Sequence, residues 1–310
     1  MLKVVCTLAS LLFLVQASFA QNQVALTIDD VPNTSAYQAN GFESPLMRTT
    51  DSLRIPVTIF IVESKIYATD HVVQNFALLN QWIRKDYVTP GNHSFTHRHY
   101  STVGFGAFTR DLLKGEAISG ELAAKAQKAL KYFRFPYNDL GTDSTQHDSI
   151  ARFLTEHGYR NAPFTIESSD YMFNSLYAHY LRQGQPEKAA QIGRTYIEFT
   201  LTLFDFFEQV SADQYHRPIR QIYLCHDSAL NARYLPELVK KLRARNYTFI
   251  SLGAALQDPV YQHREYYQGK WGYSWVYRWM EDKDRRSALM KKEPFLMDIY
   301  EEYKKINSVN

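Results

Sequence analysis

Short runs of β-forming residues alternate with stretches of helical periodicity along most of this chain, and this alternation leaves few possible folds. Seven such runs lie at residues 24–28, 57–62, 87–89, 132–135, 160–162, 222–225 and 247–250. Segments between them, such as 149–158 and 235–246, carry apolar residues at helical spacing. Because parallel strands need a helical crossover between them, the pattern predicts a mainly parallel α/β fold.

The first twenty residues have the features of a secretory signal peptide. Lys3 precedes an apolar run at 4–15, and small residues flank Phe19 before a cleavage position after Ala20. The run is shorter than the roughly 20 apolar residues of a spanning helix. We therefore expect an exported protein, periplasmic or extracellular, with no stable membrane span after cleavage. An uncleaved membrane anchor is the alternative.

The net charge and the cysteine content bear on two questions: whether the protein binds nucleic acid, and whether disulfide bonds stabilise it. Without Lys3 the 35 basic residues become 34 against 32 acidic ones, a net charge of +2 that argues against a nucleic-acid partner. Cys6 leaves with the signal peptide, so Cys225 is alone and no intramolecular disulfide forms. Stability must come from packing. The oligomeric state is not readable from the sequence.

Two segments stand apart from the main domain, which we place at residues 21–258. Residues 171–221 are too long for a simple crossover loop and contain a stretch with a wide apolar helical face, so we predict a helical insertion. Residues 259–310 are aromatic and charged, and predict a C-terminal helical extension. Its Trp271, Trp275 and Trp279 are four residues apart. Packing against the main domain is favoured over sugar stacking.

Three histidines lie within seven positions after the run at 87–89. If this segment turns helical, His93 and His97 share one helix face and both imidazoles can reach one cation. His99 falls off that face. A hydrated polar loop is the alternative reading of the same residues, so the spacing alone does not establish a metal site.

Polar residues that follow other strands strengthen the metal interpretation. Asp29 and Asp30 close the first run, and the carboxyl ends of parallel strands face the ligand site in such folds. One aspartate is suited to join the two histidines as a third ligand, while its neighbour stays free as a base. A turn or helix cap before Pro32 is the structural alternative.

Three further polar positions lie at or after the ends of predicted strands. Arg134 lies in the run at 132–135, Asp170 follows the run at 160–162, and His226 follows Cys225. Since alternate residues of a strand point to opposite faces, a buried Cys225 thiol is compatible with a His226 that faces the site. An isolated arginine beside aromatic residues usually covers surface, so Arg134 is informative only together with the others.

Five short motifs occur in an order that resembles the polysaccharide deacetylase family, which is carbohydrate esterase family 4 with its NodB-homology domain. They are TIDDVP, HSFTH, RFPY, SDY and LCH, and the resemblance spans about residues 24–252. It implies a distorted (β/α) barrel with about seven parallel strands. It also implies a divalent metal held by Asp30, His93 and His97. Zinc is the default, although cobalt, nickel, manganese and iron suit the same ligands.

The resemblance also implies roles for five residues. Asp29 would be the general base for the attacking water, and Arg134 would keep it ionised and aimed. His226 would protonate the leaving amine while Asp170 holds its other ring nitrogen. The backbone N–H of Tyr137 would bind the oxyanion. The expected substrate is an N-acetylated carbohydrate polymer such as peptidoglycan, a chitin-like glycan or an exopolysaccharide.

Some residues depart from the family pattern. Val31 and Asn138 stand where glycine is usual, which narrows the freedom of the backbone near the cleft. Tyr171 replaces a usual tryptophan, so Asp227 is an alternative partner for His226. Three other functions are compatible with these residues: the same chemistry on a non-sugar amide or O-acetyl ester, an inactive glycan-binding homologue, or an iron oxygenase. The last leaves Asp29 without a role.

Overall fold

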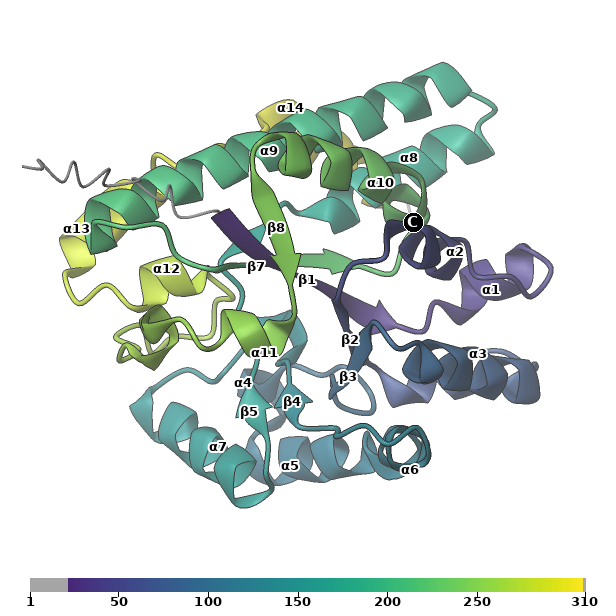
Figure 1. Cartoon of the computed structure of the whole chain (residues 1–310), viewed down its shortest axis with the longest axis horizontal. Helices are drawn as coiled ribbons and strands as arrows, with labels where there is room; N and C mark the ends of the chain where they lie inside the picture. Colours follow the sequence, from purple (N-terminus) through teal and green to yellow (C-terminus); the bar gives the residue numbers. More distant parts are fainter. Residues whose placement is uncertain (1–21, 309–310) are drawn as a thin grey trace, which may run out of the picture.

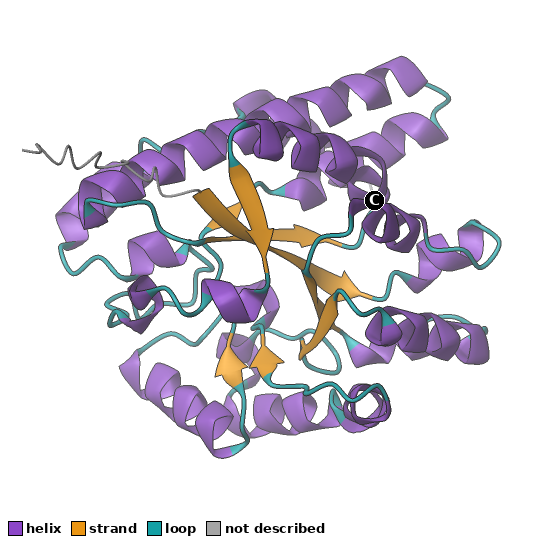
Figure 2. Ribbon diagram, in the orientation of Figure 1, coloured by secondary structure: helices purple, strands orange, loops and turns teal. Residues whose placement is uncertain are grey.

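A curled, fully parallel sheet forms the centre of the protein (Figures 1 and 2). The computed structural model describes residues 22–308, so the expected signal peptide lies outside the described residues. The strands are β1 (Asn22–Val31), β2 (Val57–Ile61), β3 (Val88–Asn92), β4 (Tyr132–Phe133), β5 (Arg160–Asn161), β6 (Ile166–Glu167), β7 (Gln221–His226) and β8 (Tyr247–Ile250). Their order is β5-β4-β3-β2-β1-β7-β6, with β8 paired to β1.

Helices cover the outside of this sheet (Figure 2). The first half of the chain forms α1 (Thr34–Ala39), α2 (Pro45–Leu53), α3 (Val72–Arg84), α4 (Tyr100–Val103), α5 (Phe105–Lys114), α6 (Ala117–Lys125) and α7 (Ser144–Glu156). The second half forms α8 (Asp170–Arg182), α9 (Pro186–Tyr215), α10 (Ala229–Ala244), α11 (Leu252–Ala255), α12 (Trp275–Arg278), α13 (Lys283–Met290) and α14 (Met297–Asn307). Three 3₁₀ turns are η1 (Glu63–Tyr67), η2 (Pro136–Asn138) and η3 (Pro259–Gln262). Among the described helices, none combines the length and apolar character needed to cross a bilayer.

Strand β1 is the axis of the sheet. One of its edges pairs with β7 through residues 24–29, and its other edge is shared by β8 at residues 22–25 and by β2 farther along. Its residues 24–28 are at most 1% exposed, as expected for a parallel strand with both faces covered. The register places Asp29 beside His226 on β7. The distorted (β/α) barrel predicted from the sequence is confirmed.

Two local predictions were incomplete. Strand β6 was not foreseen, because two residues show no periodicity, yet it is β6 that precedes Asp170. Helix α10 begins at Ala229, where the Ser228 side chain caps it by accepting from the Asn231 N–H. The helix therefore starts six residues before the stretch 235–246 that showed helical spacing, and Pro236 lies inside it.

The C-terminal extension packs where the barrel is not closed by strand pairing. Strands β5 and β6 stand at the two ends of the sheet order, and the loop between them is covered by residues around α12. Ser274 Oγ donates to the Thr165 carbonyl at 2.6 Å, and the Trp275 N–H donates to the Phe164 carbonyl at 3.0 Å. The extension is thus part of the wall of the barrel.

The three tryptophans of the extension do not share one environment. Trp275 and Trp279 are 4% and 5% exposed, so the predicted packing against the main domain is correct for them. Trp271 precedes α12 and is 60% exposed. The regular helical stripe therefore does not form, and Trp271 needs a separate explanation.

The segment predicted as a helical insertion consists mainly of α8 and the thirty-residue α9. The two helices lie side by side over the barrel (Figure 1), and Phe173 of α8 packs against Tyr196 of α9 with ring centroids 5.6 Å apart. Twelve residues of α9 are buried along one face. The first residue of α8 is Asp170, so this helix pair fixes the position of a candidate site residue.

Candidate metal centre and active site

The structure brings Asp30, His93 and His97 together at the carboxyl ends of β1 and β3. The Nε2 atoms of the two histidines are 3.2 Å apart, and Asp30 Oδ1 lies 3.4 Å from His97 Nε2 and 4.0 Å from His93 Nε2. Ligand atoms about 2.1 Å from a tetrahedral zinc ion lie about 3.4 Å apart. One ligand atom from each residue therefore fits around a single cation.

The histidines converge through a loop and not through the helix that the spacing had suggested. The Ser94 N–H bonds Asn92 Oδ1 at 2.8 Å, and the His97 N–H bonds Ser94 Oγ at 3.1 Å. Side-chain acceptors of this kind replace the hydrogen bonds of a helix. Ser94 and His97 also have positive φ angles of 65° and 57°, which a helix does not allow.

The protonation states of the three residues suit a cation. His93 Nδ1 donates to the Arg134 carbonyl at 2.7 Å, which leaves Nε2 with a free lone pair. Burial lowers the pKa of both His93 and His97 to about 4, so both rings are neutral at pH 7. Burial opposes ionisation of Asp30, but Lys65 and the two histidines outweigh it and hold its pKa well below the usual range.

One unsatisfied atom also favours a cation. Asp30 Oδ1 is buried and has no hydrogen-bond partner among the described residues, although buried carboxylate oxygens are normally paired. The same oxygen is the one that faces the two histidine Nε2 atoms. Lys65 Nζ donates to the Asp30 backbone carbonyl at 2.7 Å and lies 3.5 Å from Oδ2, on the other side of the carboxylate. A metal ion would satisfy the remaining oxygen.

Asp29 is a buried carboxylate beside this cluster. It is 2% exposed, and its Oδ2 lies 3.8 Å from His93 Nε2. Arg134, which is fully buried, approaches both Asp29 oxygens at 3.4 Å and donates to Thr27 Oγ1 at 3.2 Å. Burial raises the pKa of Asp29, while the Arg134 guanidinium opposes that rise. Asp29 is thus a carboxylate of increased basicity with a fixed orientation.

His226 lies across from Asp29 on the neighbouring strand and is held by Asp170. Asp170 Oδ1 accepts from His226 Nδ1 at 2.6 Å, and its Oδ2 accepts from the His226 N–H at 2.8 Å. Burial disfavours the imidazolium, but Asp170 more than compensates and raises the pKa of His226 to about 10. The structure therefore places Asp170 and not Asp227 against His226. Asp227 Oδ2 instead accepts from the Asn33 N–H at 2.9 Å.

The Tyr137 turn forms another wall of the site. The Tyr137 ring lies 4.7 Å from the His97 ring and stacks on His99 at 3.7 Å. Tyr137 and Asn138 both have positive φ angles, 56° and 50°. Behind this turn lies Gly272 of the C-terminal extension, where an added Cβ would come within 2.4 Å of the Tyr137 carbonyl oxygen. The extension therefore supports the turn directly.

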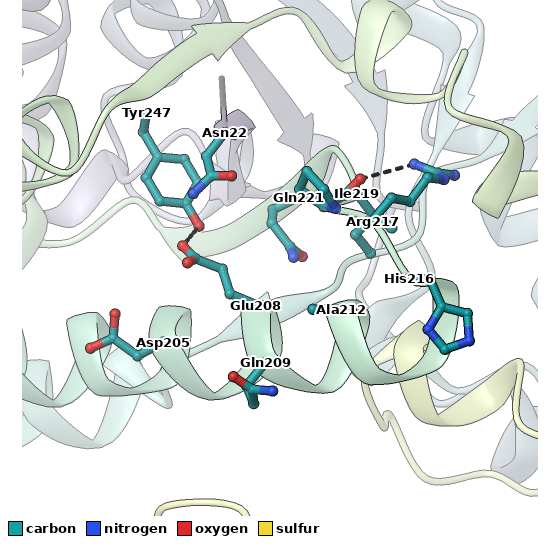
Figure 3. A pocket seen from close by; sticks show the side chains of 11 residues that line it. Asn22, Asp205, Glu208, Gln209, Ala212, His216, Arg217, Ile219, Gln221 and Tyr247 are labelled. Atoms are coloured by element: carbon teal, nitrogen blue, oxygen red, sulfur yellow. Dashed lines mark hydrogen bonds between the residues drawn. The ribbon is translucent and has the colours of Figure 1, made fainter. Parts of the chain in front are cut away.

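A pocket of about 730 Å³ lies at the opposite end of the barrel (Figure 3). It is lined by the first residues of three strands, Asn22, Gln221 and Tyr247, and by the C-terminal half of α9. Glu208 reaches across it to the Tyr247 hydroxyl. None of the candidate site residues lines this pocket. The polar groups that suggest chemistry are at the carboxyl ends of the strands.

Comparison with known families agrees with this geometry. The sequence profile described as polysaccharide deacetylase matches residues 16–168. This stretch, which is nearly half of the chain, is similar to the polysaccharide deacetylase family. The match includes the first three motifs, whereas Asp170 and His226 lie beyond it. Members of the family generally use a divalent metal and are hydrolases that remove acetyl groups, which favours this chemistry over that of an iron oxygenase. A search of curated protein sequences found no match to the chain.

Solved structures of the deacetylase family share the fold. The polysaccharide deacetylase Bc1974 from Bacillus cereus is 19% identical with a TM-score of 0.51, covering 74% of this chain and 92% of that one. A mutant of BA3943 from Bacillus anthracis, described as a CE4 family pseudoenzyme, is 14% identical with a TM-score of 0.51. That match covers 77% of this chain and 68% of the other. At these identities the likeness concerns the fold.

The structure accommodates both departures from the deacetylase glycine pattern. Val31 is fully buried at the end of β1, where it pairs with Ile61, and its φ is not positive. Asn138 does need a positive φ, and asparagine is one of the few residues besides glycine that adopts it readily. Neither substitution disrupts the local backbone.

Sequence reasoning missed two residues of this candidate site. Asn231 of α10 donates to Asp170 Oδ2 at 2.5 Å and to the His226 carbonyl at 2.9 Å, and it accepts from the Tyr196 hydroxyl at 2.7 Å. Lys65 of η1 pairs with Asp30. Both lie on elements whose local pattern gives no sign of the site, since their partners are distant in the sequence.

Replacing His97 with alanine is expected to weaken Zn²⁺ binding by about 100-fold or more, because it removes one of three ligand atoms. His99→Ala is the matched control from the same loop, since His99 contacts Asp139 and Tyr137 but not the ligand cluster. Competition with a chromophoric chelator measures both affinities. Wild-type affinity in His97→Ala would contradict the assignment of this ligand.

Replacing Gly272 with alanine is expected to lower kcat for acetate release by about 10- to 100-fold. The new Cβ must displace the Tyr137 turn, and small displacements of groups at a reacting centre slow the reaction strongly. Zn²⁺ affinity should stay within about twofold of wild type. Gly120→Ala is the control, because the nearest atom to its added Cβ is 3.9 Å away. Equal kcat in the two variants would show that the extension does not position the turn.

Proposed function

We propose that this protein is an exported, metal-dependent deacetylase that hydrolyses N-acetyl groups of a carbohydrate polymer such as peptidoglycan, a chitin-like glycan or an exopolysaccharide. One observation carries the proposal. Three ligand atoms from Asp30, His93 and His97 lie within 4.8 Å of one another. Asp29, paired with Arg134, and His226, paired with Asp170, flank them.

Asp30, His93 and His97 would hold the metal, and zinc is the simplest choice for two imidazoles and one carboxylate. When bound, a divalent cation would act as a Lewis acid that polarises the acetamide carbonyl and makes nearby water more acidic. Lys65 keeps Asp30 Oδ2 engaged, so that Oδ1 is the oxygen that faces the histidines.

Asp29 is the proposed general base. Its burial and its pairing with Arg134 hold the carboxylate in one place, and the raised pKa increases its affinity for a proton. It takes the proton from the attacking water as that water adds to the acetamide carbon. Arg134 stays charged throughout and prevents Asp29 from rotating away from the cluster. A base in this position contributes roughly 10²- to 10⁴-fold in rate.

His226 is the proposed general acid. An amine is a poor leaving group unless it is protonated, so the step that breaks the C–N bond needs a proton donor. Asp170 keeps the His226 imidazolium populated at neutral pH and orients its ring through Nδ1, which leaves Nε2–H as the donor. Because β1 and β7 are neighbouring strands, the base and the acid flank the same reacting carbon.

The developing oxyanion needs a hydrogen-bond donor. By the family resemblance we assign this role to the backbone N–H of Tyr137, in the turn that Gly272 supports. The turn is held in its left-handed conformation by its contacts and not by glycine. A preorganised donor of this type is effective because it does not have to reorient during the reaction.

Acetate release tests the proposal. The mature protein, loaded with Zn²⁺, is incubated separately with N-acetylglucosamine oligomers, peptidoglycan, O-acetylated xylan and small non-sugar acetamides. We expect acetate from one or both N-acetylated glycans at the highest kcat/KM of the panel. A preference for xylan or for the small amides would redirect the assignment to an O-acetyl ester or a non-sugar amide. Glycan binding without any acetate would identify an inactive homologue.

A further inference from the structure

The C-terminal extension brings an exposed tryptophan to the edge of the candidate active site. Gly272 lies against the Tyr137 carbonyl and the Asn138 side chain, so its neighbour Trp271 is adjacent to the Tyr137 turn. Trp271 is 60% exposed and Tyr137 is 52% exposed. Two large exposed aromatic residues thus belong to this turn and to the segment packed against it, and the Tyr137 ring is 4.7 Å from that of His97, a candidate cation ligand.

Trp271 differs from the other three tryptophans of the chain. Trp82, Trp275 and Trp279 are at most 5% exposed and belong to the core. Lys270 Nζ lies 5.0 Å from the centre of the Trp271 ring, but most of Trp271 stays in solvent. It therefore forgoes much of the favourable burial of a large apolar surface. A single exposed apolar residue is common on protein surfaces, but exposed apolar residues that lie together mark an interaction site. Trp271 is informative because it lies beside the exposed Tyr137.

The backbone of Trp271 is nevertheless firmly anchored. Its carbonyl accepts from Arg278 Nη1 at 3.0 Å, and its N–H donates to the Tyr267 hydroxyl at 3.3 Å. Arg278 is fully buried and is itself fixed by Glu265. The side chain is therefore presented to solvent from a rigid segment, which lowers the entropic cost of binding a ligand there.

We propose that Trp271, together with Tyr137, forms an aromatic subsite that stacks against a sugar ring of the glycan next to the residue being deacetylated. This inference rests on the proposed function. The flat C–H faces of a pyranose ring are apolar, whereas its edges carry hydroxyl groups, so an exposed indole or phenol ring matches its face. The predicted ligand is a chain of N-acetylhexosamines, because a single sugar at the cation cannot also cover Trp271.

The subsite would bind the polymer and not the reacting acetamide. Its removal should therefore weaken binding of long substrates and leave the chemical step largely intact, which is the signature of uniform binding. For an N-acetylglucosamine hexamer, we expect Trp271→Ala to raise KM about tenfold, corresponding to about 1.4 kcal/mol. The change in kcat should be less than about threefold.

Tryptophan fluorescence tests the contact directly and does not require turnover. Because Trp271 is the exposed tryptophan, acrylamide quenching of the wild-type protein reports mainly on this ring. The hexamer should reduce that quenching and shift the emission to shorter wavelength. In Trp271→Phe the hexamer should no longer change the quenching, but KM should stay within about threefold of wild type because a stacking ring remains.

Phe76→Ala is the control, since Phe76 is 40% exposed on α3. In this variant, the hexamer should protect Trp271 from acrylamide quenching as in wild type, and KM for the hexamer should be unchanged. Protection by the hexamer without any acetate release would support the subsite and remove the proposed deacetylase activity. Acetate release with no protection of Trp271 would overturn the subsite alone. Protection that depends on protein concentration and not on glycan would also overturn it, in favour of self-association through Trp271.

Discussion

Asp29→Asn is expected to lower kcat for acetate release by about 10²- to 10⁴-fold, because the amide cannot accept the proton of the attacking water. Zn²⁺ affinity should change little, since Asp29 contributes no atom to the ligand cluster. Single-turnover acetate release and chelator competition measure the two quantities on the same preparation. Among the variants proposed, this one separates catalysis from metal binding most clearly.

The appropriate comparison for Asp29→Asn is Asp30→Asn, which changes the neighbouring residue of the same strand end. That variant should lose Zn²⁺ affinity, because the amide lacks the negative charge of the Asp30 carboxylate, which is a proposed ligand. Asp29→Asn also leaves the buried Arg134 without its carboxylate, and unpairing a buried charge costs about 3–5 kcal/mol of stability. Thermal unfolding must therefore confirm that both variants are folded at the assay temperature. Full activity in folded Asp29→Asn would remove Asp29 from the mechanism.

Loss of the acid should have an effect of similar size. His226→Gln is expected to lower kcat by about 10²- to 10⁴-fold, since glutamine cannot protonate the leaving amine.

Asp170→Asn is expected to move the alkaline limb of the kcat/KM profile to lower pH. The profile between pH 5 and 10 checks the second result, and His93 and His97, with pKa values of about 4, stay neutral over that range.

The direction of this shift follows from the balance of forces on His226. Burial lowers the pKa of its imidazolium, and the charge and hydrogen bond of Asp170 raise it to about 10. Without that charge, burial dominates and the imidazolium loses its proton at lower pH. A cation held by Asp30 would repel the imidazolium and lower its pKa further in both proteins. The acid form, and with it the activity, is therefore lost as pH rises, and is lost earlier in Asp170→Asn.

Asp227→Asn is the matched control for Asp170→Asn. Asp227 follows His226 directly in the sequence, but its carboxylate binds the Asn33 backbone and not the imidazole. Its substitution should leave the alkaline limb in place. An unchanged limb in Asp170→Asn, or a limb displaced equally in both variants, would show that Asp170 does not set the acidity of His226.

The sequence could predict the parts of the site that follow strands directly. Asp29 and Asp30 end an apolar run, and His226 ends another, so the parallel arrangement alone brings them to one edge of the sheet. The position of Arg134 beside Asp29 follows from the same rule, because β4 runs parallel to β3 and reaches the same end. Local periodicity and chain direction carry this information.

Other features depend on contacts between distant residues and leave no local pattern. Asn231 reaches Asp170 from α10, and Gly272 reaches the Tyr137 turn from an extension that lies well over a hundred residues away in the sequence. The loop conformation of residues 93–97 depends on the Asn92 and Ser94 side chains. Their oxygens accept hydrogen bonds from backbone N–H groups that a helix would use. The spacing of His93 and His97 suits both conformations, so the structure was needed to distinguish them.

The proposed role of a metal ion at Asp30, His93 and His97 is tested by the metal dependence of acetate release. Acetate from an N-acetylglucosamine hexamer is measured with the purified Zn²⁺-loaded protein, with the same protein after chelation and dialysis, and after Zn²⁺ is added back. We predict that chelation lowers the rate at least about 100-fold and that one equivalent of Zn²⁺ restores it in wild type but not in His97→Ala. Undiminished acetate release from the chelated protein would contradict the account.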